Sequence, residues 1–134
     1  MRHRIAVLIF ITFLTGLVGE SSTSPLFQEH KQSSMTIKGH LVDVSCIVKH
    51  SNEPKSDKSW AKEHDRQCLV NADSAKSGYA VFTIEKSVYR FDDAGNKIAK
   101  KLIADTKREI DWKVTVTGLV ERDIISVSDL VLEK

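Results

Sequence analysis

Two cysteines and one histidine are the residues of this sequence whose types and spacing could support chemistry. Cys46 and Cys68 are its 2 cysteines, and His64 lies one helical turn before Cys68. If this segment is a helix, His64 and Cys68 share one face. Cys46 could then add a third ligand, and His40 or His50 a fourth. Because thiolate and imidazole groups suit soft ions, one hypothesis is a Cu(I) or Zn(II) site formed by Cys46, His64 and Cys68.

The same two cysteines support a structural hypothesis. In an oxidising compartment an even number of cysteines is most simply paired as disulfides. A bond between Cys46 and Cys68 would close a loop of about 20 residues, which stabilises a fold by ~3 kcal/mol if the effect is chain entropy. We expect this disulfide, with His64 as a neighbouring polar residue, and the metal site is the alternative. A catalytic dithiol is disfavoured, because such enzymes usually carry Cys-x-x-Cys.

The N-terminal residues predict the compartment. Met1–Arg4 is basic, and the run Ile5–Gly19 is predominantly apolar and contains no charged residue. This is the layout of a secretory signal peptide, and the run is shorter than the ~20 residues that a membrane-spanning helix needs. We therefore expect residues 1–19 to be removed. The mature chain is then expected in the periplasm or outside the cell, with no stable membrane span.

Removal of the signal also changes the charge. The full chain has 20 Lys and Arg against 18 Asp and Glu, which gives a net charge of +2. Arg2 and Arg4 leave with the signal, so the basic and acidic residues of the mature chain balance. Nucleic-acid binding normally needs a basic surface. A nucleic-acid partner is therefore disfavoured.

The mature chain divides into a tether and one domain. Residues 20–34 are rich in Ser and other polar types, which predicts a flexible tether, and residues 35–134 are expected to fold. The alternating stretch 36–48 predicts a curved strand with Gly39 at a bend. An inserted helix is expected over residues 60–70, between polar loops. The later elements are expected to be strands 79–85 and 87–91, a helix from Asn96 to Asp105, and strands 111–118 and 124–132.

This order of elements predicts the fold class. We expect a mostly β protein with two helices, namely an OB-like five-stranded partly open barrel with a helical insert after strand 1. A split sheet with a packed helix is the alternative. The predicted core includes Val114 and Val116, together with a helical stripe that consists of Ile98, Ala99, Leu102 and Ile103.

Four short motifs resemble a known group of proteins. They are Gly39-x-Leu-Val-Asp-x-x-Cys46, His64-x-x-x-Cys68, Asp93-Ala-Gly-Asn96 and Val114-x-Val-Thr-Gly118. Over Met35–Lys134 the chain resembles small exported bacterial proteins that carry a predicted OB-like domain and no settled activity. The resemblance implies export and an OB-like fold. Some similar sequences have a further cysteine soon after the position of Cys68, where this chain has Leu69 and Val70.

No motif in the sequence names a reaction, so we expect a binding role rather than catalysis and no cofactor. The predicted function is an exported binding or interaction module of the bacterial periplasm or cell envelope, with an envelope protein or a small ligand as partner. Metal binding is the alternative. Ligand binding on the barrel face is the third hypothesis, because exposed aromatic side chains on such a face can stack on a sugar or a peptide. The candidate aromatic residues are Trp60, Tyr79, Phe82, Tyr89, Phe91 and Trp112.

Overall fold

The computed structural model describes residues 33–52 and 59–134 of the chain. The predicted signal peptide and nearly all of the predicted tether lie outside these residues. The first described strand begins at Ser34, next to the predicted start of the domain at Met35. Among the described residues, no helix is long and apolar enough to cross a membrane.

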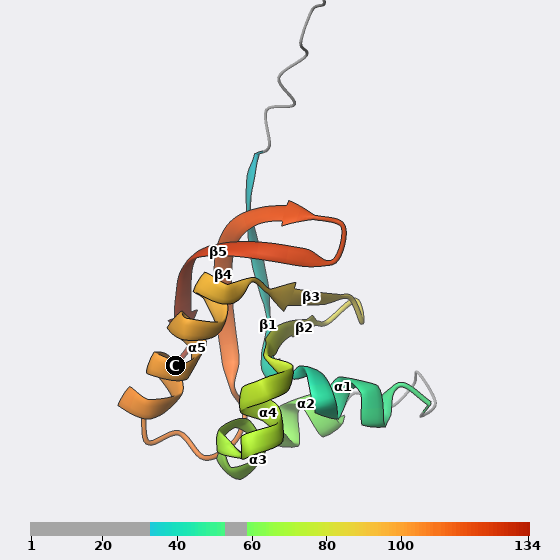
Figure 1. Ribbon diagram of the computed structural model, residues 1–134, viewed down its shortest axis with the longest axis vertical. Helices are drawn as coiled ribbons and strands as arrows, with labels where there is room; N and C mark the ends of the chain where they lie inside the picture. The colour runs from blue at the N-terminus through green and yellow to red at the C-terminus, as the bar shows by residue number, and fades with distance from the viewer. Residues whose placement is uncertain (1–32, 53–58) are drawn as a thin grey trace, which may run out of the picture. The chain divides into compact units, whose positions relative to one another are not determined.

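Five strands form one mixed sheet (Figure 1). They are β1 Ser34–Asp43, β2 Tyr79–Thr83, β3 Val88–Phe91, β4 Lys113–Glu121 and β5 Ile124–Leu132. They pair in the order β1-β2-β3-β5-β4, and β4 pairs back onto β1, so the pairings close a ring. All neighbours are antiparallel except β3 and β5, which are parallel. The prediction of five strands is therefore confirmed.

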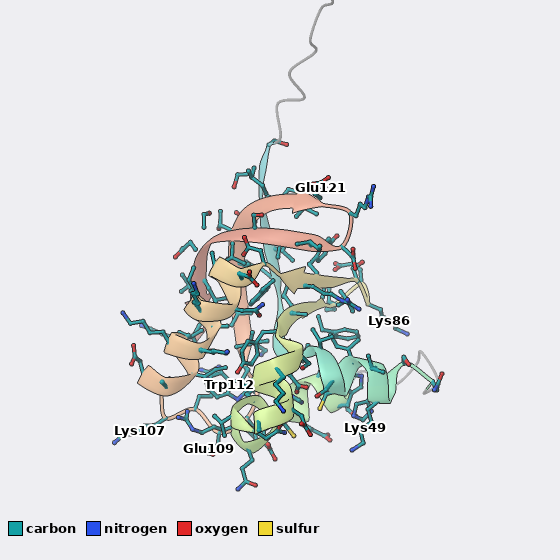
Figure 2. The ribbon with its side chains drawn as sticks, viewed as in Figure 1. Lys49, Lys86, Lys107, Glu109, Trp112 and Glu121 are labelled. Carbon is teal, nitrogen blue, oxygen red and sulfur yellow. The ribbon has the colours of Figure 1, made fainter. Side chains whose placement is uncertain are left out.

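The strands follow from alternating side chains. In β4, the buried residues Val114, Val116 and Gly118 alternate with more exposed ones, as expected of a strand with one face on a core. Val114 and Val116 are completely buried, which confirms their predicted place in the core. Trp112, just before β4, is also completely buried and is labelled in Figure 2.

Helix α5 (Asp93–Asp105) lies between β3 and β4 in the sequence. Of its predicted stripe, Ala99 and Ile103 are buried, and Ile98 and Leu102 pack partly buried against the core. The helix begins earlier than predicted, because Asp92 and not Asn96 caps it by accepting from the Gly95 N–H at 2.8 Å.

Asn96 instead links two strands. Its side-chain oxygen accepts from the Tyr79 N–H at 2.8 Å, and its amide nitrogen donates to the Phe91 carbonyl at 3.2 Å. These bonds tie the start of β2 to the end of β3 from within α5.

The insert between β1 and β2 differs most from prediction. It contains α1 Val44–His50, α2 Ser59–Glu63, α3 Arg66–Val70 and α4 Ala72–Ser77. In Figure 1 these helices gather at the end of the sheet where β1 finishes and β2 begins. The described residues thus contain five helices, and the prediction of two is wrong. The expected strand to Val48, the single helix over residues 60–70 and the polar loop expected after that helix are corrected accordingly.

Side-chain caps explain the extra helices. Asp43, Asp65 and Asn71 each accept a hydrogen bond from the N–H three residues later, at 2.9, 2.8 and 2.9 Å respectively. Such short polar side chains compete with strand pairing and favour a helix start. They end β1 at Asp43 and interrupt the predicted long helix at Asp65.

Candidate metal centre

Cys46, His64 and Cys68 come together at the helical end of the molecule. One ligand atom from each, the two sulfur atoms and a ring nitrogen of His64, all lie within 4.8 Å of one another. His64 is 5% exposed, and both cysteines are partly buried. The structure therefore assembles the three residues that the sequence nominated as metal ligands.

The route to this cluster differs from the predicted one. His64 was expected to share a helix with Cys68, but it lies in the break between α2 and α3. Cys46 was expected at the end of a strand, but it is in α1. The ligands are thus brought together by three separate short elements rather than by helical periodicity.

Two copies of the pattern Asp-x-x-Cys position the cysteines. Asp43 precedes Cys46, and Asp65 precedes Cys68, by three positions each. In both cases the aspartate caps a short helix and accepts from the cysteine backbone N–H, at 2.9 Å for Cys46 and 2.8 Å for Cys68. Each cysteine is therefore held in the first turn of its helix by its own aspartate.

Asp43 also contacts His64. Its Oδ2 lies 3.0 Å from His64 Nε2, and Asp43 itself is completely buried. Its Oδ1 accepts from the Ser45 hydroxyl and from the Cys46 N–H. Burial would raise the pKa of Asp43, but the interactions with His64, Ser45 and the Cys46 backbone outweigh it and hold that pKa well below its usual range.

The thiols are protonated at neutral pH in the metal-free protein. Burial, followed by the hydrogen bond to Asp43, raises the pKa of Cys46 to about 12. Burial, followed by the hydrogen bond to Asp65, raises the pKa of Cys68. Since the thiolate is both the nucleophile and the metal ligand, this pair is a poor nucleophile. It becomes a strong ligand set when a cation displaces the protons.

Both cysteines are free thiols in the structure. The predicted Cys46–Cys68 disulfide is not formed here, and it stays a prediction for the oxidised protein.

The two suggested sources of a fourth ligand lie outside the cluster. His40 Nε2 contacts Asp111 Oδ1 at 3.0 Å. His50 stacks on Trp60, with ring centroids 4.7 Å apart and an interplanar angle of 9°. Trp60 in turn meets His64 edge-on, at a centroid distance of 6.2 Å. Its indole is therefore close enough to report on the cluster.

The predicted aromatic platform is not assembled as a set. Trp112, Tyr79 and Phe91 are buried in the core and cannot stack on a ligand. Trp60 and Phe82 are partly buried, with ring centroids 5.2 Å apart. Phe82 lines a hollow of about 410 Å³ together with Lys38, His40, Lys62 and other residues. Ligand binding on this face stays a prediction.

No family model, curated protein or solved structure matches the chain.

Asp43 is the site residue that sequence reasoning passed over. The available signal was the repeated Asp-x-x-Cys pattern, which marks a cap before each cysteine. That signal could have predicted two helix starts, but not the contact between Asp43 and His64.

Proposed function

We propose that this protein binds a soft transition-metal ion, Cu(I) or Zn(II), through Cys46, His64 and Cys68. The observation that carries the proposal is the approach of three ligand atoms to within 4.8 Å of one another. Ligand atoms at 2.0–2.3 Å from one ion lie about 3.5–4 Å apart. Small side-chain movements are therefore sufficient to close the set around a cation.

The chemistry of the set favours these ions. Two thiolates and one imidazole are soft to intermediate donors, which select Cu(I) and Zn(II) over the hard cations Mg²⁺ and Ca²⁺. Three protein ligands leave room for a further ligand, as in zinc sites that keep an open position. Partial burial of both cysteines leaves a path for the ion from solvent.

The wider setting is also proposed. The ring order β1-β2-β3-β5-β4, with α5 before β4, supports an OB-like barrel as the scaffold. The basic and apolar N-terminus supports export. On this proposal the protein is an exported, non-enzymatic binding module of the cell envelope, and the metal ion is its ligand.

The test uses reduced mature protein prepared without oxygen. Native mass spectrometry should show one Cu(I) or Zn(II) bound, with two protons lost from the thiols. Titration against a competing chelator gives the affinity, and the tryptophan fluorescence, to which Trp60 beside His64 contributes, gives a second readout. Separate titrations with each ion decide between them.

Variants locate the site. Cys46→Ser, Cys68→Ser and His64→Ala should each weaken binding by at least about tenfold. The matched control is His40→Ala, because His40 is paired with Asp111. Wild-type affinity in all three site variants, or isolation of only the disulfide form with no metal uptake after reduction, would reject the proposal.

A further inference from the structure

The two oxygens of the Asp43 carboxylate face different partners. Oδ1 accepts from the Ser45 hydroxyl and from the Cys46 N–H at 2.9 Å. Oδ2 lies 3.0 Å from His64 Nε2. This second contact is bent away from a straight hydrogen bond, and neither atom has another hydrogen-bond partner within the described residues. Within the described residues, Oδ2 and Nε2 therefore have only each other as polar partners.

The chemistry of this pair determines where the imidazole carries its proton. An ionised carboxylate can only accept, and a neutral imidazole has one N–H and one lone pair. Beside Oδ2, Nε2 must be the N–H, which leaves the lone pair on Nδ1. Asp43 is completely buried and His64 is 5% exposed, and both Oδ2 and Nε2 are buried atoms, so water does not offer Nε2 another partner.

We infer that Asp43 is a positioning residue that fixes the His64 tautomer and makes Nδ1 the metal-binding atom. The inference rests on the proposed metal site. A carboxylate behind a ligating imidazole orients the ring and raises its basicity. Asp43 also holds the Cys46 backbone. One buried side chain thus places two ligands from different elements.

The substitution Asp43→Asn isolates this role. Asn is as good a helix cap as Asp, and its side-chain oxygen can keep the two donors at the Oδ1 position. Its amide nitrogen then faces His64 Nε2 and donates to it. The ring must move its proton to Nδ1, so the lone pair points away from the ion.

Asp92→Asn is the matched control. Asp92 caps α5 and accepts from the Gly95 N–H in the same way, but α5 contributes no residue to the cluster. We expect Asp43→Asn to lower metal affinity 10- to 100-fold, and Asp92→Asn to change it less than about twofold. Circular dichroism confirms that each variant is folded.

Nitrogen-15 NMR of the imidazole supplies a readout that a purely structural role would not move. Metal-free wild type should show the Nε2–H form, and Asp43→Asn should show the Nδ1–H form. On metal binding, the wild-type Nδ1 signal should shift as a coordinated nitrogen. A wild-type ring in the Nδ1–H form, coordination through Nε2, or unchanged affinity in Asp43→Asn would overturn the inference.

The two proposals fail separately. If the wild-type protein binds neither ion, the proposed metal-binding function is rejected. The tautomer of the metal-free His64 ring then still shows whether Asp43 fixes it. If Asp43→Asn does not fold, the wild-type spectra alone decide it. If the wild-type protein binds metal but its metal-free His64 ring is in the Nδ1–H form, only the positioning role of Asp43 is rejected.

Discussion

The two Asp-x-x-Cys segments share a local structure and differ in their surroundings. In both, an aspartate caps a short helix and holds a cysteine N–H. Asp43 is completely buried and contacts His64, whereas Asp65 is exposed. The same local pattern therefore yields a simple cap in one place and a cap with a second partner in the other. Tertiary position, rather than the motif, supplies the additional role.

The two helices are also anchored differently. Helix α3 contains the completely buried Leu69, whose carbonyl accepts from the Tyr79 hydroxyl at 2.8 Å. Helix α1 has no buried residue of its own. It is held through Asp43 at its start and through the partly buried Val44 and Ile47. Helix α3 thus has a completely buried apolar residue, whereas the completely buried group at α1 is the carboxylate of Asp43.

The largest expected effect tests the apolar anchor. Leu69→Ala should lower the free energy of unfolding by about 2–5 kcal/mol, because it leaves a cavity in the core beneath α3. The matched change in α1, Ile47→Ala, should cost less, since Ile47 is partly exposed. Urea denaturation of the reduced, metal-free protein measures both values. Equal losses would show that the two helices are anchored alike.

The next effect tests the polar anchor. Asp43→Ala should cost about 2–4 kcal/mol of unfolding free energy, because it removes a cap and leaves His64 Nε2 buried without an acceptor. Asp65→Ala removes only a cap and should cost about 1 kcal/mol. The same denaturation experiment compares them. If Asp65→Ala lowers the free energy of unfolding more than Asp43→Ala does, the proposed difference between the two segments is wrong.

The third effect is the pH dependence of metal affinity, to which both cysteine thiols contribute. The pKa of each thiol is raised, that of Cys46 to about 12, so both are protonated near neutral pH. Metal binding must then release both protons, and affinity should rise with pH by up to roughly 100-fold per pH unit. Cys46→Ser and Cys68→Ser should each reduce this to about tenfold per unit. A chelator competition between pH 6 and 8 measures the slopes, and a pH-independent affinity would contradict the raised pKa values.

Much of the fold was predictable from local patterns. The alternation in β4 and the apolar stripe of α5 indicated their burial, and the four strands after β1 lie close to their expected ranges. The insert was less predictable. The β-branched residues after Asp43 suggested that the strand continued, but the capping bond from the Asp43 side chain begins a helix instead.

The sequence alone determined the ligand types and the strand faces, because these depend on residue type and on a short alternating run. Only the tertiary structure decided that Cys46, His64 and Cys68 lie close together, and that the Asp43 carboxylate contacts His64. Asp43 and His64 belong to different elements, and the burial of their contact requires the chain to return across the end of the sheet. The closed ring of strands holds these elements in place. The contact between Asp43 and His64 therefore cannot be read from the spacing of residues in the sequence.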